Sequence, residues 1–132
     1  IFDGIAIVKF LYWLEKNKFK KISELDCQNK IENFKKKNKY YLGPSFETIS
    51  AFGKNASIVH YNAKDYKTNY LRKNNLYLLD CGSQYFYGTT DRRQTNHPRS
   101  RTMLRRLMHL AMCIAQRNQS LPYAQQLLTY LR

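Results

Sequence analysis

Two aspartates, Asp80 and Asp91, are the residues of this sequence whose type and spacing most clearly suggest chemistry. They lie eleven residues apart in the stretch YLLDCGSQYFYGTTD. Alternation along a strand places Asp80 on the same face as Leu76 and Leu78, where the pattern would otherwise have an apolar side chain. A buried carboxylate is costly to leave unpaired, so Asp80 needs a hydrogen-bond donor, a cation or a metal ion.

The glycines between the two aspartates indicate how the carboxylates could meet. The segment from Gly82 to Gly88 can reverse the chain, so that Asp91 returns beside the strand that holds Asp80. Two like charges held close together favour a divalent cation between them. The residues alone leave a second interpretation open, in which each aspartate only caps a turn.

The elements that must position these carboxylates are two helices followed by short strands. Apolar residues recur at helical spacing in residues 5–14, and Ser23 is a suitable N-cap for a second helix that begins at Glu24. From Tyr40 onward, the segments FETISAFG, SIVHY and LYLLD are typical of strands separated by turn residues. Residues 62–75 are polar and are typical of a loop. The sequence therefore predicts an α+β fold with a mostly antiparallel sheet.

Length and composition limit the class of protein. With 132 residues, 43% of them hydrophobic, the chain is expected to form one domain or part of a larger one. No apolar run approaches the roughly 18 to 20 residues needed to cross a bilayer, so we expect no membrane span. The cysteines Cys27, Cys81 and Cys113 are far apart and have no CxxC spacing, which argues against a disulfide framework and favours the cytoplasm.

The composition of charged residues changes abruptly after Asp91. Residues 1–91 contain every lysine and all nine acids, whereas residues 92–132 contain eight arginines, no lysine and no acid. Such a switch indicates a boundary between two regions. Apolar residues at helical spacing in the second region, and a helix start at Ser120, predict that it is a basic helical tail.

The stretch LYLLDCGSQYFYGTTD resembles the segment that carries the first two metal ligands of the Xaa-Pro aminopeptidases, which are metallopeptidases of the pita-bread fold. Their pattern there is a hydrophobic strand, Asp-x-Gly-x-x-Tyr and Gly-Thr-Thr-Asp. Upstream, DGIAIVKFLYWLE and SELDCQNKIENFK are similar to the first two helices of the family's catalytic domain. LGPSFETISAFGKNASIVHY is similar to the segment with its Ser-Phe-x-Thr-Ile-Ser and Ile-Val-His-Tyr patterns. The resemblance is colinear over about residues 3–91, and it implies the opening part of a pita-bread catalytic domain.

This resemblance implies roles for three residues. Asp80 and Asp91 correspond to metal-binding carboxylates, Asp91 to the one that bridges two ions, and His60 to a histidine that lines the substrate pocket. Members of the family use two divalent ions, often Mn²⁺, to activate a water molecule that attacks the peptide bond before a proline at the second position. Carboxylate oxygens suit Mn²⁺, and a metal pair can lower the pKa of bound water.

The sequence departs from the family pattern directly after Asp91. The family continues with a Thr-Arg-Thr strand and later supplies a histidine and two glutamates to the metal site. Here RRQTNHPRSRTML follows, no acid occurs in residues 92–132, and His97 and His109 lie in no Gly-rich motif. We therefore expect a truncated aminopeptidase-like chain that is inactive alone and holds metal weakly or not at all.

The sequence leaves rival interpretations open. The tail is either an out-of-frame or foreign continuation, or a genuine amphipathic hairpin that covers the sheet or binds an acidic surface. With a net charge of +14 and 11 tyrosines, the chain could instead be a nucleic-acid-binding module, but no known signature is present and only nonspecific binding is expected. It could also be a partner-binding module whose partner carries the missing ligands.

Overall fold

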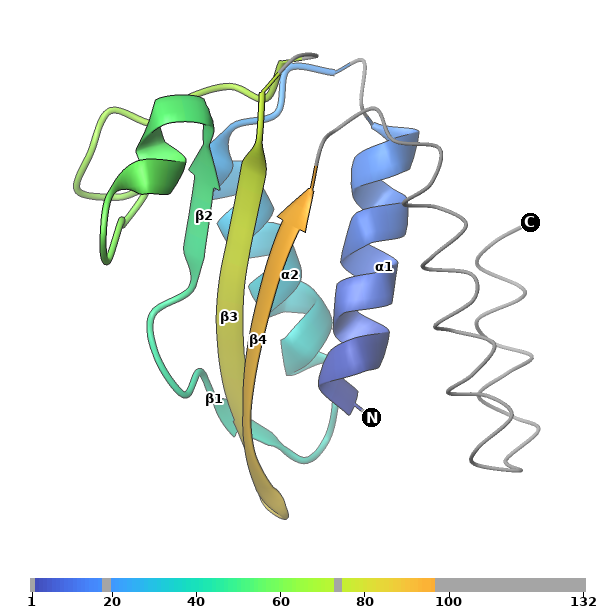
Figure 1. The fold of residues 1–132 in the computed structure, drawn as a ribbon. Helices are drawn as coiled ribbons and strands as arrows, with labels where there is room; N and C mark the ends of the chain where they lie inside the picture. Colours follow the sequence, from blue (N-terminus) through green and yellow to red (C-terminus); the bar gives the residue numbers. More distant parts are fainter. Residues whose placement is uncertain (1, 18–19, 73–74, 97–132) are drawn as a thin grey trace.

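Two helices open the chain, as the sequence predicts. α1 spans Phe2–Lys16 and α2 spans Glu24–Lys36, and both lie on one side of the sheet (Figure 1). The computed structural model describes residues 2–17, 20–72 and 75–96.

The predicted helices of the tail lie outside the described residues. Among the described residues, no helix is long and apolar enough to cross a membrane.

The start of α2 confirms the predicted N-cap. Ser23 Oγ accepts a hydrogen bond from the Asp26 N–H at 3.1 Å, and Asp26 Oδ2 accepts one from the Ser23 N–H at 2.9 Å. This reciprocal arrangement is a capping box, which gives partners to two backbone amides at the helix start. Asp26 also places a negative charge in the first turn, where the helix dipole favours it.

Within the described residues, four antiparallel strands form one sheet around a central strand, β3. β4 pairs along one edge of β3, and β1 and β2 pair with opposite ends of its other edge. The turn between β3 and β4 contains only Phe86 and Tyr87, so the predicted reversal is confirmed, with Gly82 inside β3 and not in the turn. The strands are β1 Tyr41–Gly43, β2 Ile49–Phe52, β3 Tyr77–Tyr85 and β4 Gly88–Asn96. The predicted α+β architecture is thereby confirmed.

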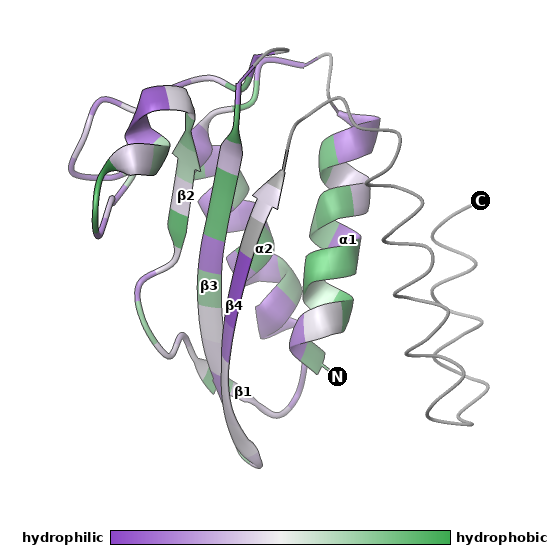
Figure 2. Ribbon diagram, in the orientation of Figure 1, coloured by the Kyte–Doolittle hydropathy of each residue, from purple (hydrophilic) through white to green (hydrophobic). Residues whose placement is uncertain are grey.

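The main core lies between the helices and one face of the sheet. Its residues from β3 are Tyr77, Leu79 and Cys81, all of them fully buried. They pack against the apolar faces of α1 and α2, including Phe10 and Ile31. Figure 2 shows α1 as largely hydrophobic and the middle of β4 as strongly hydrophilic. Apolar burial therefore fixes the helix-facing side of β3, while β4 brings polar residues to the same sheet.

The opposite side of the sheet, which we call the open face, carries the residues that alternate with this core. Leu78 packs there in a smaller cluster with Ala51, Tyr61 and Ala63. Asp80 lies two residues after Leu78 on the same face, as the alternation predicts. The open face therefore combines an apolar end with a carboxylate further along β3.

One predicted strand is wrong. SIVHY forms no strand: the 3-10 helix η1, Gly53–Ser57, runs into it, and Ile58 to Tyr61 follow as irregular chain. The reason is a distant acid. Glu24 is fully buried and accepts hydrogen bonds from the Phe52 N–H at 2.6 Å, from Asn55 Nδ2 at 3.1 Å and from the Tyr61 hydroxyl at 2.8 Å. These bonds draw the segment around one carboxylate, so that it packs over the open face instead of pairing as a strand.

Candidate functional site

The structure brings the two predicted metal ligands onto one face. In the ladder between β3 and β4, Asp80 lies opposite Arg93, and Gly82 lies opposite Asp91. Residues directly opposite each other share a face, so Asp80 and Asp91 both belong to the open face, at diagonal positions. Diagonal neighbours in an antiparallel pair are roughly 7 to 8 Å apart between Cα atoms, a separation that two carboxylates can bridge through an ion.

The carboxylate of Asp80 is only partly satisfied by the protein. Its side chain is 18% exposed, and its Oδ2 lies 3.6 Å from Arg93 Nε in an ion pair. Its Oδ1 is buried and has no hydrogen-bond partner among the described residues. Burial raises the pKa of Asp80, the Arg93 guanidinium lowers it in part, and the negative charge of Asp91 raises it further. A buried oxygen without a donor, beside a second carboxylate, is an arrangement that a cation would relieve.

The carboxylate oxygens of Asp80 and Asp91 suit a hard divalent cation. Carboxylate oxygens are the ligands that Mn²⁺ and Mg²⁺ prefer, and Asp91 is exposed and accessible from solvent. Among the residues that the structure describes, no group of three or more His, Cys, Asp or Glu side chains is arranged to hold a metal ion. Asp80 and Asp91 are therefore a pair of candidate ligands, with no third such side chain arranged beside them in the described residues.

His60, the third predicted site residue, lies in the irregular segment between η1 and Tyr61. It is exposed, and its φ of 54° lies in the left-handed region that non-glycine residues rarely adopt. Its neighbour Tyr61 packs with Leu78 on the open face, so the segment that carries His60 lies over the same face as Asp80. The described contacts join His60 to neither aspartate.

Gly82 is a site residue that sequence reasoning missed, since it was assigned to the turn. A side chain at this position would meet Ser45 Oγ and the backbone oxygen of Thr90, and would lie 2.7 Å from Phe46 Cε1. The loop before β2 therefore crosses β3 directly beside Asp80 and opposite Asp91. The signal in the sequence was the Asp-x-Gly pattern itself, because a glycine inside a strand often marks a close backbone approach.

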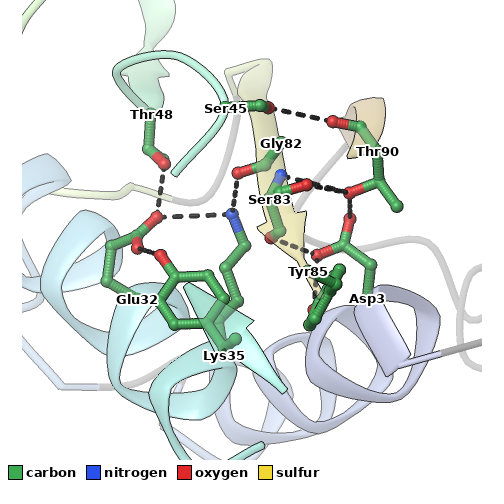
Figure 3. A network of polar contacts seen from close by, with 10 residues as sticks. Asp3, Glu32, Lys35, Ser45, Thr48, Gly82, Ser83, Tyr85 and Thr90 are labelled. Atoms are coloured by element: carbon green, nitrogen blue, oxygen red, sulfur yellow. Dashed lines mark hydrogen bonds and ion pairs between the residues drawn. The ribbon is translucent and has the colours of Figure 1, made fainter. Parts of the chain in front are cut away.

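A second missed feature is the polar network behind the hairpin, on the helix side of the sheet (Figure 3). It joins Asp3 of α1 to Ser83 and Thr90, the residues next to Gly82 and Asp91. It also joins Lys35 of α2 to the Gly82 carbonyl at 3.1 Å. The signal in the sequence was Asp3, an acid at the start of a mostly apolar helix.

Comparison with known proteins gives consistent relatives. The model of metallopeptidase family M24 matches residues 2–116. Xaa-Pro aminopeptidase 2 of Sus scrofa is 41% identical over 96 residues, which are 72% of this chain and 14% of that protein. A probable Xaa-Pro aminopeptidase P of Paracoccidioides brasiliensis is 40% identical over 98 residues, which cover 16% of its length. The chain thus spans about one-seventh of the length of the curated relatives that it matches.

Solved structures agree with these relatives. The X-prolyl aminopeptidase of Caenorhabditis elegans, described as a cytosolic enzyme with a di-nuclear active site, matches with a TM-score of 0.70 and 34% identity. The match covers 75% of this chain and 17% of that one. Aminopeptidase P of Escherichia coli matches with a TM-score of 0.59 at 20% identity, which supports the fold. The described residues therefore form part of the fold that these enzymes share.

Proposed function

Because the chain belongs to metallopeptidase family M24, we propose that it carries two carboxylates of a dinuclear metal site, Asp80 and Asp91. The family membership and the partial pita-bread fold are the premise, and one observation carries the assignment. Asp80 has a buried oxygen to which no described residue donates a hydrogen bond, and Asp91 lies diagonally from it on the open face. A divalent cation between the two would satisfy the orphaned oxygen and neutralise both charges.

The proposed metal is Mn²⁺, and the proposed ligands are the oxygens of Asp80 and Asp91. Two bound metal ions would supply an activated water molecule and polarise the carbonyl of a peptide bond. The chain's own residues contribute the position of the two carboxylates and the apolar end of the open face around Leu78. No further carboxylate comes from residues 92–132, which contain none. We therefore propose that this chain alone does not complete the site.

The proposed substrate class is a peptide with proline at the second position, acted on when the site is completed by further ligands. His60 is the proposed substrate-lining residue, and its exposure and its place beside Tyr61 on the open face support that role. We place the protein in the cytoplasm, with support from the C. elegans relative that is described as cytosolic. Binding of nucleic acid stays a prediction of nonspecific, salt-sensitive attraction.

The assignment is tested by titrating Mn²⁺ into the protein and following the free ion by electron paramagnetic resonance. Two carboxylates with water in the other positions predict a dissociation constant on the order of 1 mM. Asp80→Asn and Asp91→Asn should each weaken binding by about tenfold. Asp65→Asn makes the same change of charge on an exposed turn and serves as the control. Equal Mn²⁺ affinity in all three variants and the wild type would overturn the assignment.

A further inference from the structure

A buried carboxylate of α1 reaches the hairpin that carries Asp91. Asp3 lies in the first turn of α1 and is 1% exposed. Its Oδ1 accepts hydrogen bonds from Ser83 Oγ at 2.7 Å and from the Tyr85 hydroxyl at 3.3 Å, and its Oδ2 accepts one from Thr90 Oγ1 at 2.9 Å. The three donors come from β3 and β4 (Figure 3). Asp3 therefore ties α1 to both strands of the hairpin.

Thr90 is held from several directions at once. Its hydroxyl donates to Asp3 and accepts a hydrogen bond from the Ser83 N–H at 3.1 Å. Its carbonyl oxygen accepts a hydrogen bond from Ser45 Oγ at 2.9 Å. Thr90 directly precedes Asp91, and side chains alternate along a strand, so Thr90 points to the helices and Asp91 to the open face. Fixing Thr90 from behind therefore fixes the backbone from which the Asp91 carboxylate projects.

A second group of contacts, from α2, holds the strand opposite. The side chain of Lys35 is fully buried, and its Nζ donates to the Gly82 carbonyl at 3.1 Å and to Glu32 Oε1 at 3.3 Å. Glu32 also accepts hydrogen bonds from the Thr48 hydroxyl at 2.6 Å and from the Tyr41 hydroxyl at 2.7 Å. Gly82 lies opposite Asp91, so the contacts from α1 and α2 converge on one point of the hairpin.

We propose that Asp3 is a positioning residue for Asp91, acting through Thr90. The proposal rests on the proposed function only in taking Asp91 as a metal ligand. An apolar side chain could fill the space of Asp3 with a smaller desolvation cost. The carboxylate adds direction, because its two oxygens fix where the hydroxyls of Ser83 and Thr90 point. Asp3 lies on the helix side of the sheet, so it would position the Asp91 carboxylate without contacting a metal ion bound there.

The test compares variants that change the hydrogen bonds between Asp3 and the hairpin. Thr90→Val keeps the shape of the side chain but removes both the donor to Asp3 and the acceptor for the Ser83 N–H, whereas Thr90→Ser keeps the hydroxyl. Asp3→Asn removes the charge from the acceptor. Glu24→Gln is the matched control, since Glu24 is also a fully buried carboxylate, but it bonds to Phe52, Asn55, Tyr61 and Asn69, away from the hairpin.

Two readouts separate positioning from general stability. Hydrogen exchange of the Thr90 and Asp91 amides should be at least tenfold faster in Thr90→Val and Asp3→Asn than in Thr90→Ser or Glu24→Gln, after correction for global stability from urea unfolding. The Mn²⁺ dissociation constant should rise by about fivefold in the first two variants and stay within twofold in the others.

The outcomes are distinguishable from those of the proposed function. Exchange rates and Mn²⁺ affinities that follow only global stability would overturn the positioning role of Asp3. A wild-type protein that binds no Mn²⁺ would contradict the proposed function instead. In that case the exchange rates at Thr90 and Asp91 still decide whether Asp3 holds this part of β4 in place.

Discussion

At the scale of single residues, the raised pKa of Asp80 links the site to stability. The folded protein holds the Asp80 proton more tightly than the unfolded chain does, because burial disfavours the charged form. The contribution of Asp80 to the free energy of unfolding is therefore most favourable at pH values below its unfolded-state pKa, and it is lost as the pH rises through its folded-state pKa. The Arg93 ion pair offsets this only in part, since the Arg93 side chain is 70% exposed and well screened by solvent.

Asp80→Asn should therefore stabilise the metal-free protein at pH 7, by roughly 0.5 to 1 kcal/mol. The amide carries no charge to desolvate at any pH, so the gain should shrink as pH falls towards about 4. Urea unfolding at pH 7, 5.5 and 4.5 measures the difference. A variant that is less stable than the wild type at pH 7 would mean that the carboxylate is already well paired.

Arg93 is the residue that competes with a metal ion for Asp80. Its guanidinium lies on the open face beside Asp80 Oδ2, where a positive charge repels an incoming divalent cation. Arg93→Thr should therefore lower the Mn²⁺ dissociation constant by about threefold, a modest effect because the side chain is exposed. Arg92→Thr makes the same change of charge opposite Cys81, on the helix-facing side of the ladder, and should have a smaller effect. Identical shifts for the two variants would indicate net charge as the cause.

Gly82→Ala tests the close approach of the loop before β2. The added methyl group would collide with the Thr90 backbone oxygen, which cannot move without shifting Asp91. We expect a loss of about 2 to 3 kcal/mol in the free energy of unfolding, measured by urea denaturation. Gly43→Ala is the control, because no atom of the described part of the chain lies within 4 Å of the added carbon there, and it should change stability far less. A neutral Gly82→Ala would show that both the loop and the Thr90 backbone can move away from this position of β3.

At the scale of elements, sequence patterns predicted the features that are formed by residues close together in the chain. The capping box at Ser23, the two helices and the hairpin between Asp80 and Asp91 all depend on residues close together in the chain, and the structure confirms them. The SIVHY strand failed because Glu24, far away in the sequence, bonds to Asn55 and Tyr61 and bends the segment. Gly82 and Asp3 were missed for the same reason, since their partners lie elsewhere in the chain.

The cap of α2 gives a prediction for one element. Ser23→Ala removes the acceptor for the Asp26 N–H and should lower the free energy of unfolding by about 1 kcal/mol. Ser57→Ala, at the end of η1, removes an exposed hydroxyl that donates to the Lys54 carbonyl, and should cost less. Equal losses in the two variants would argue that the first turn of α2 is held by Glu24 and its partners and not by the cap.

At the scale of the whole molecule, the carboxylates that this sequence contains lead to a prediction about activity. The relatives that it matches are about six to seven times as long in sequence as the matched region, and this chain contains no acid after Asp91. We therefore expect no release of the N-terminal residue from an Xaa-Pro peptide by this chain in Mn²⁺, since two carboxylates alone leave most coordination positions to water. Chromatography of the peptide after prolonged incubation measures the reaction.

Mn²⁺-dependent release that disappears in Asp91→Asn would contradict the prediction, because it would mean that ligands outside the described residues complete the site. Release that persists in Asp91→Asn would identify a contaminating peptidase, so that variant is the control on which the measurement depends.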